Sequence, residues 1–332
     1  MTLLPPRKPR DRSPSQPVDQ VVGYFGMRSV SLGRDDNGFR RLSLNGKPIF
    51  HYGPLDQGWW PDGLYTAPTD AALLYDLEIT KQLGFNMVRK HVKVEPARWY
   101  YHCDRLGLMV WQDMPNGDAH IRPEEADISR SQKSASQYET EWQRIIETLH
   151  NHPCIVMWVP FNEGWGQFDT QRIVKWTHEL DPTRLIDDAS GWTDRDCGDV
   201  LDIHAYPGPG MPSPELNRAA VLGEYGGLGL PVEGHTWQDK DNWGYRGYES
   251  EQQLNDAYHD LVAKLNPLID AGLAAAVYTQ TTDVETEVNG IMTYDREVIK
   301  FDLPRAAKAN RALYRPLQRV KVVIPTSTRD QP

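Results

Sequence analysis

Two glutamates at the ends of apolar runs are the residues of this sequence best suited to chemistry. Glu163 follows the apolar run 154–161 and Glu224 follows the run 219–223, and glycine comes soon after each. Apolar runs of this length are typical of strands buried on both faces of a parallel sheet. In a parallel barrel, catalytic residues lie at the carboxyl ends of the strands. Two carboxylates meeting there could hydrolyse a glycosidic bond, one as nucleophile and one as acid and base.

The segments around the glutamates alternate between strand and helix patterns. The expected strands are residues 49–53, 85–91, 108–113, 154–161, 184–188, 200–204, 219–223 and 274–280. The expected helices are residues 69–83, 96–106, 137–150, 169–180, 251–272 and 303–314. Eight strands with intervening helices predict an α/β fold, a closed (β/α)₈ TIM barrel rather than an open doubly wound sheet. No Gly-rich phosphate-binding fingerprint follows any of these strands, which argues against a nucleotide site.

The barrel is expected to carry short extensions. Residues 1–18 are rich in Pro, Arg and Ser, a composition typical of disorder. Residues 19–48 are predicted to form a β-ribbon, with alternating runs at 24–30 and 39–44 and a hairpin signal at Asn45-Gly46. The catalytic barrel is expected over residues 49–316, followed by a tail over 317–332.

Composition excludes several classes of partner. The 332 residues carry a net charge of −10 without a basic stripe, so neither nucleic acid nor an anionic membrane is an expected partner. The three cysteines show no metal-ligand spacing, and His51-Tyr52 is not a His-x-His pair, so we expect no metal and no cofactor. The basic start is not followed by an apolar segment, which favours a cytoplasmic protein without a secretory signal.

Polar residues at other strand ends are candidates for a sugar subsite. Asn162 could hold a sugar 2-hydroxyl, although an Asn before a turn is more often a turn residue. Arg89 and His91 end the second strand, and the Arg89 charge could keep a carboxylate ionised, unless it forms a surface ion pair. His204 and Tyr206 follow the sixth strand, where the phenol could hydrogen-bond the nucleophile or anchor a loop.

Aromatic and acidic side chains complete the candidate set. Trp165, Trp192 and Tyr278 fall in loops or at strand ends, and their rings could stack on the C–H faces of a sugar. Some of these rings must instead be packing residues. Asp56 follows the first strand and could bind sugar hydroxyls, with structural capping as the alternative.

Several runs resemble a known family. Residues 158–167 with Asn162-Glu163, and residues 223–227 with Glu224, look like the acid/base and nucleophile segments of clan A glycoside hydrolases. Residues 45–50, 83–89 and 104–111 are similar to the catalytic domain of family 2 glycoside hydrolases, the β-galactosidase, β-glucuronidase and β-mannosidase group. The resemblance covers roughly residues 24–315.

The resemblance implies a TIM barrel with Glu163 as acid/base and Glu224 as nucleophile. It also implies that Arg89, Asn162, His204 and Tyr206 hold the cleaved sugar. The chain departs from the family where Tyr278-Thr279-Gln280 end the eighth strand, since many relatives have Trp there. The Asn-x-Lys with which β-glucuronidases recognise a carboxylate is not visible after Glu224.

The resulting hypothesis is a retaining, exo-acting β-glycosidase, β-galactosidase-like, that acts by double displacement on a glycoside or oligosaccharide. Two other interpretations predict different behaviour. A truncated, non-catalytic barrel would bind sugar without cleaving it, and a purely structural barrel would have no pocket at Glu224.

Overall fold

An eight-stranded parallel sheet forms the centre of the computed structural model, which describes residues 2–3 and 19–314. The strands are β6 (His51–Asp56), β7 (Met87–Lys90), β8 (Met109–Asp113), β9 (Ile155–Val159), β10 (Leu185–Ile186), β11 (Val200–Ala205), β12 (Ala219–Gly226) and β15 (Ala275–Thr279). Their hydrogen-bonded order is β10-β9-β8-β7-β6-β15-β12-β11, so the last strand returns to pair with the first. Across this described part of the chain the ladder is open between β10 and β11. The nearly closed parallel sheet confirms the predicted (β/α)₈ barrel.

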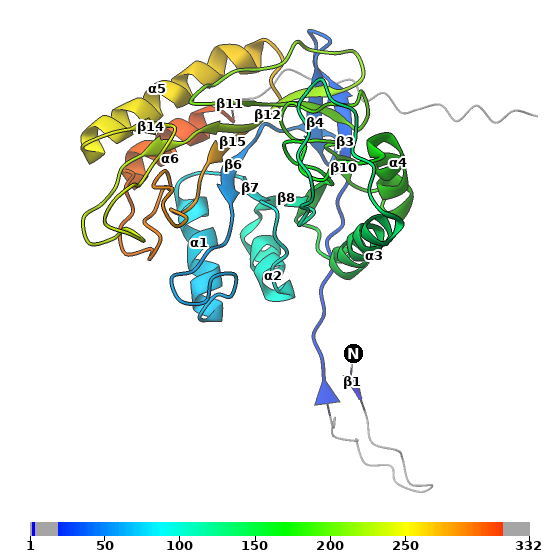
Figure 1. Ribbon diagram of the computed structural model, residues 1–332, viewed down its shortest axis with the longest axis horizontal. Coiled ribbons are helices and arrows are strands. Elements are labelled where there is room, and N and C mark those ends of the chain that lie inside the picture. Colours follow the sequence, from blue (N-terminus) through cyan, green and yellow to red (C-terminus); the bar gives the residue numbers. More distant parts are fainter. Residues whose placement is uncertain (1, 4–18, 315–332) are drawn as a thin grey trace, which may run out of the picture.

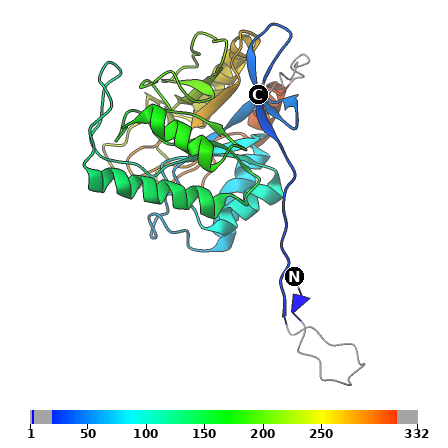
Figure 2. The same cartoon turned by 90° about the vertical axis from the view of Figure 1, so that its right-hand side faces the viewer.

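Helices surround the sheet (Figures 1 and 2). They are α1 (Asp70–Gln82), α2 (Ala97–Leu106), α3 (Gln132–Leu149), α4 (Thr170–Leu180), α5 (Glu251–Asp270) and α6 (Leu303–Ala312). Helix α3 begins before the predicted residue 137, because Ser131 caps it by accepting a hydrogen bond from the Ser134 amide. The described chain forms no helix between β10 and β11 or between β11 and β12, and none of the predicted helices falls there.

The N-terminal ribbon closes one end of the barrel. It consists of β3 (Val30–Arg34), β4 (Arg40–Leu44) and β5 (Lys47–Pro48), and the predicted turn at Asn45-Gly46 joins the last two. Leu42 is fully buried among the apolar side chains of the barrel interior. Arg41 donates to the carbonyls of Ile269 and Leu273, just before β15 begins. The ribbon therefore covers the amino ends of the strands and leaves the carboxyl ends free.

One predicted ribbon segment differs from the structure. Residues 24–29 lie outside every described ladder, and β3 begins at Val30. The side chains of Phe25 and Met27 are exposed, and Tyr24 and Arg28 attach this stretch to the barrel through side-chain hydrogen bonds rather than through a backbone ladder.

Two short ladders complete the described structure: β1 (Thr2–Leu3) with β2 (Asp19–Gln20), and β13 (Leu228–Gly229) with β14 (Arg246–Gly247). Apart from Thr2 and Leu3, the predicted disordered segment 1–18 lies outside the described residues, as does the predicted tail 317–332. None of the helices among the described residues is long and apolar enough to span a bilayer.

Candidate active site

Both glutamates predicted from the sequence meet at the carboxyl end of the barrel. Glu163 lies in the turn after β9, with φ of 51°, and Glu224 lies within β12, which extends beyond its predicted end. One side-chain oxygen of each glutamate and one ring nitrogen of His204 all lie within 4.8 Å of one another. The Glu224 side chain is 6% exposed and the Glu163 side chain 24%. A buried and a more accessible carboxylate thus face one another.

A β-bulge turns Glu224 toward the barrel interior. In the β11–β12 ladder, Ile203 pairs with Leu222 and His204 pairs with Glu224, so Gly223 is the extra residue. Bulges of this kind change which side of the sheet a side chain faces. A Cβ on Gly223 would collide with the carboxylate of Asp202, which also accepts a hydrogen bond from the Gly223 amide. Glycine is therefore required at this position.

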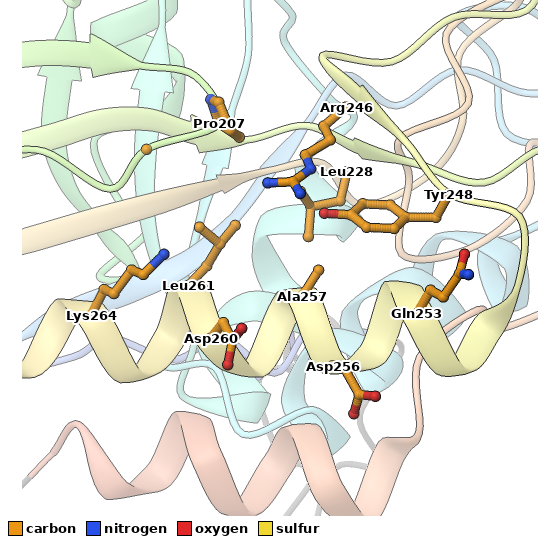
Figure 3. Close-up of a pocket in the computed structure, with 11 residues that line it drawn as sticks. Pro207, Leu228, Arg246, Tyr248, Gln253, Asp256, Ala257, Asp260, Leu261 and Lys264 are labelled. Atoms are coloured by element: carbon orange, nitrogen blue, oxygen red, sulfur yellow. The ribbon is translucent and has the colours of Figure 1, made fainter.

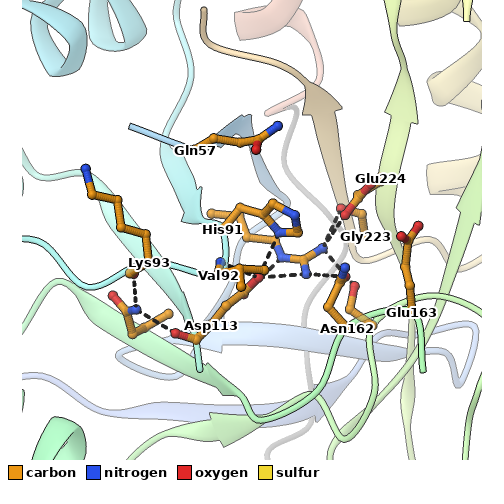
Figure 4. Close-up of polar contacts among 12 residues, drawn as sticks. Gln57, His91, Val92, Lys93, Asp113, Asn162, Glu163, Gly223 and Glu224 are labelled. Carbon is orange, nitrogen blue, oxygen red and sulfur yellow. Dashed lines mark hydrogen bonds and ion pairs between the residues drawn. The ribbon is translucent and has the colours of Figure 1, made fainter. Parts of the chain in front are cut away.

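Arg89 connects several strand ends beside Glu224, and its partners Asp113, Asn162 and Glu224 are labelled in Figure 4. Its guanidinium is fully buried and donates to both Asp113 oxygens, at 3.1 and 2.9 Å. It also donates to Oδ1 of Asn162 at 2.8 Å and to Oε1 of Glu224 at 3.3 Å. Planar forked donors suit this kind of simultaneous recognition. Arg89 therefore fixes Asn162 and Glu224 relative to each other.

His204 lies beside both glutamates. Its Nδ1 is 2.8 Å from Oε1 of Glu163 and 3.5 Å from Oε2 of Glu224. Its Nε2 is 2.8 Å from the hydroxyl of Ser190, which in turn donates to Asp202. Burial lowers the pKa of His204, but the Glu224 charge and the hydrogen bond to Glu163 outweigh burial and raise it above its ordinary value.

Tyr206 holds the other oxygen of Glu224. Its hydroxyl donates to Oε2 at 2.6 Å and lies 2.7 Å from Oγ1 of Thr279, and its ring stacks on Tyr245. Burial raises the pKa of Glu224, but the positive charges of His204, His91 and Arg89 and this hydrogen bond together lower it below the ordinary value. Glu224 is therefore held in its ionised form.

Two residues predicted to bind substrate, Tyr278 and Asp56, do not face Glu163 and Glu224. Tyr278 is fully buried in the layer between sheet and helices, packed against the rings of Tyr225, Tyr258 and Phe301. Its prediction as a substrate-binding residue is wrong, because alternation along β15 turns the next residue, Thr279, toward the site.

Asp56 has a structural role instead. It is buried, accepts from Lys90 at 2.7 Å and accepts from the backbone amide of Gly58 at 2.9 Å. Both carboxylate oxygens are therefore occupied within the protein, which corrects its prediction as a sugar ligand.

The remaining predicted residues surround the pair at different distances. His91 lies 3.0 Å from Asp113 and acts electrostatically on Glu224. Trp192 contacts His204 edge to face, with ring centroids 5.7 Å apart. Trp165 is 49% exposed and contacts His120, farther out on the rim.

Comparison with known proteins identifies the family. A sequence model described as the TIM barrel domain of glycosyl hydrolases family 2 matches residues 41–210, about half of the chain. The chain belongs to glycosyl hydrolases family 2. The match includes Glu163, Arg89 and His204 and ends before Glu224.

Curated relatives of this family 2 chain are considerably longer. It is 28% identical to a Vibrio cholerae β-galactosidase over 225 residues, which is 63% of this chain and 21% of the relative. It is 29% identical to a Klebsiella pneumoniae β-galactosidase over 173 residues, 50% of this chain and 16% of the relative. The chain thus corresponds to about a fifth of the length of these relatives, or less.

Solved structures share the fold. A Dictyoglomus thermophilum β-D-glucuronidase superposes with a TM-score of 0.67 at 16% identity, over 89% of this chain and 55% of that one. An Eisenbergiella tayi GH2 β-galacturonidase, solved with galacturonate, superposes with a TM-score of 0.63 at 17% identity, over 87% of this chain and 55% of that one. At these identities the likeness establishes the family 2 barrel fold alone.

Several residues of this family 2 site were not predicted from the sequence. Ser190, Asp202, Tyr245 and Thr279 all contact predicted site residues. Two of them carry a usable signal: Asp202 precedes His204 by two residues, so alternation along one strand puts both on the same side of the sheet. Thr279 follows Tyr278 in the chain and occupies the place in the site that was predicted for Tyr278.

The trio of Glu163, His204 and Glu224 also has the spacing of a metal-ligand set. However, Nδ1 of His204 is already hydrogen-bonded to Glu163, and the Arg89 guanidinium faces Glu224. A cation would have to displace a proton and approach a fixed positive charge. The trio therefore suits a shared proton better than a divalent ion.

A separate surface pocket of about 470 Å³ lies between α5, the β13–β14 ladder and the segment that follows β11 (Figure 3). Its lining includes Arg246, Tyr248, Asp256, Asp260 and Lys264 and neither of the paired glutamates. The paired carboxylates at the strand ends, rather than this pocket, mark the candidate active site.

Proposed function

We propose that this family 2 barrel is a retaining β-glycosidase that acts by double displacement. The observation that carries the proposal is the approach of Glu163 and Glu224, which bring a carboxylate oxygen of each within 4.8 Å. Retaining enzymes hold their two carboxyl groups about 5–5.5 Å apart, whereas inverting enzymes need roughly 6.5–9.5 Å to admit a water. The observed spacing supports the retaining arrangement.

Glu224 is the nucleophile of the first step. Arg89, Tyr206 and the nearby His204 stabilise its negative charge, and it lies deeper than Glu163. Its carboxylate attacks the anomeric carbon and forms a glycosyl ester while the bond to the leaving oxygen breaks. Glu163, which is more accessible and hydrogen-bonded to His204, donates a proton to that oxygen.

Water completes the reaction in the second step. Glu163, now ionised, removes a proton from a water that attacks the anomeric carbon, and the ester bond to Glu224 breaks. Asn162 adjoins Glu163 in the chain and is fixed by Arg89, so we assign it to the sugar 2-hydroxyl. The protein regains its starting protonation and the sugar keeps its anomeric configuration.

The two relatives above are named β-galactosidases, so aryl β-galactosides are the first substrates to test. The panel also includes aryl β-glucosides, β-mannosides, β-xylosides and β-glucuronides. Substrates and variants are compared on the whole chain, with Glu147→Gln on the exposed face of α3 as a charge-matched control.

Azide distinguishes the two carboxylate roles. We expect Glu224→Ala to lose at least about 10⁴-fold in kcat, and azide to restore turnover with an α-glycosyl azide as product. We expect Glu163→Ala to lose about 10²–10⁴-fold, and azide to give the β-glycosyl azide. Turnover like wild type in either variant, or the same azide anomer from both, would reject the assignment.

A further inference from the structure

A third carboxylate is linked by a chain of contacts to the side of the site that holds Glu224. Glu287 belongs to the loop that follows β15 and forms a parallel bridge with Trp243. Backbone hydrogen bonds from Trp243 to Thr286 and from Val288 to Trp243 lock the two loops together. The Trp243 ring contacts Tyr245 edge to face at 5.5 Å, and Tyr245 stacks on Tyr206. Trp243, Tyr245 and Tyr206 thus form a row of aromatic rings that connects the Glu287 loop to the nucleophile.

Tyr206 binds Glu224 and stacks on Tyr245, so the contact of Trp243 with Tyr245 brings the Glu287 loop to the nucleophile side of the site. The charges of Glu224 and His91 both act on Glu287, so it lies within their range. Glu224, Glu287 and Glu163 all act on the phenol of Tyr245, whose pKa is raised first by burial and then by these charges. Because the nucleophile side receives the sugar rather than the leaving group, Glu287 is positioned against the sugar.

A relay of side-chain amides orients Glu287. Gln57, which lies in the loop after β6 and is labelled in Figure 4, donates to Oε1 of Gln280 at 2.8 Å. Gln280 donates to Oδ1 of Asn289 at 2.8 Å, and Asn289 donates to Oε1 of Glu287 at 2.7 Å. Gln280 and Asn289 thus each accept through the oxygen and donate through the nitrogen, and the relay ends on the Glu287 carboxylate. Such pre-orientation is typical of side chains that select a ligand.

Glu287 lacks a cationic partner in the described part of the chain, since no Lys, Arg or His there lies within ion-pair distance. Burial raises its pKa, and the Glu224 charge adds to this effect. An acceptor of this kind is satisfied by hydroxyl donors and is incompatible with a second anion at short range.

We propose that Glu287 is a specificity-determining residue that accepts hydrogen bonds from hydroxyls of an uncharged sugar and excludes sugars bearing a carboxylate. This inference depends on the proposed glycosidase function. The fold alone does not decide between these substrates, because the similar solved structures include proteins named for uronic acids and the curated relatives are named β-galactosidases.

The test compares Glu287→Gln with Glu285→Gln, which removes the same charge from an exposed position of the same loop. For wild type we expect kcat/KM for the best neutral aryl β-glycoside to exceed that for the aryl β-glucuronide by at least about 10³-fold. Glu287→Gln is expected to lower kcat/KM for the neutral glycoside by about 10–100-fold. It should also reduce the ratio of neutral-glycoside to glucuronide kcat/KM by at least about 10-fold, while Glu285→Gln changes neither quantity. Equal ratios in the two variants, or a wild-type preference for the glucuronide, would overturn the inference.

Thermal unfolding and calorimetry keep the two proposals separable. An unfolding midpoint for Glu287→Gln near that of wild type shows that the loop is intact, and Glu287→Asp serves as a second variant if it is not. If wild type cleaves no glycoside, the proposed function fails. Glu287 is then tested by the binding of neutral sugar against glucuronate to wild type, where tighter binding of glucuronate, or binding of neither sugar, contradicts its role.

Discussion

Nδ1 of His204 lies 2.8 Å from Oε1 of Glu163. The hydrogen bond at Nε2, the other ring nitrogen, determines whether a proton is available for this contact. Ser190 donates its hydroxyl hydrogen to Asp202 and can therefore only accept from Nε2 of His204. With Nε2 protonated, one further proton lies between Nδ1 and the Glu163 carboxylate. In the proposed mechanism this is the proton that the leaving group receives, and a hydrogen bond strengthened by charge holds it.

Replacing His204 with Asn should impair proton donation more than bond breaking. We expect kcat/KM to fall by about 10-fold for aryl glycosides with acidic leaving groups and by at least about 100-fold for alkyl glycosides. The measurement is the dependence of kcat/KM on the pKa of the leaving group, which should become steeper. An equal loss across all leaving groups would show that His204 acts only on packing.

Replacing Tyr206 with Phe should shift the acid limb of the pH profile upward. The Tyr206 hydroxyl stabilises the ionised form of Glu224, so its removal raises the pKa of Glu224. Activity that requires ionised Glu224 is then lost at a higher pH as the solution is acidified. We expect kcat/KM measured from pH 4 to 9 to show this shift together with a loss of about 10–100-fold.

Tyr24→Phe is the matched control, because Tyr24 donates to Asp104 far from the strand ends. An unchanged acid limb in Tyr206→Phe would mean that Tyr206 does not act through Glu224.

Replacing Lys300 with Met should destabilise the loop after β15, which contains Glu287. Lys300 is buried and donates to Asp283 at 2.6 Å, to the carbonyl of Val288 and to that of Leu230. Removing it leaves Asp283 buried without a cation, and we expect a loss of about 3–5 kcal/mol in the free energy of unfolding.

The pH dependence of that loss follows from Asp283. Burial raises the pKa of Asp283 to about 6 even with Lys300 present, and the substitution raises it further. A carboxyl whose folded pKa exceeds its unfolded value stabilises the folded state at low pH and loses that effect as pH rises. Urea unfolding should therefore show a larger loss at pH 8 than at pH 5, and the double variant with Asp283→Asn should recover much of it. A loss below about 1 kcal/mol at pH 8 would contradict this.

The barrel and the approach of Glu163 to Glu224 were predictable because parallel strands converge at their carboxyl ends. Apolar runs located the strands, and polar residues following them, such as Glu163, Arg89 and His204, had to lie at one end of the barrel. The bulge at Gly223 was not visible in the sequence, yet Glu224 needs it to face the site.

The errors have physical causes of the same kind. Residues 274–278 are apolar at every position, so no alternation indicates which way Tyr278 points, and a shift of one residue exchanges it with Thr279. Asp56 pairs with Lys90, which is buried although lysine is rarely found inside a protein. Glu287 lies in a loop whose position depends on pairing with Trp243, a contact between distant segments.

The anomeric configuration of the first-formed sugar tests the central claim most directly. Wild-type protein is mixed with the aryl β-glycoside that it cleaves best, and proton NMR spectra are recorded before mutarotation equilibrates the product. Double displacement through Glu224 and Glu163 predicts that the β-anomer appears first and the α-anomer later. An α-anomer formed first would show inversion and would contradict the roles assigned to the two glutamates.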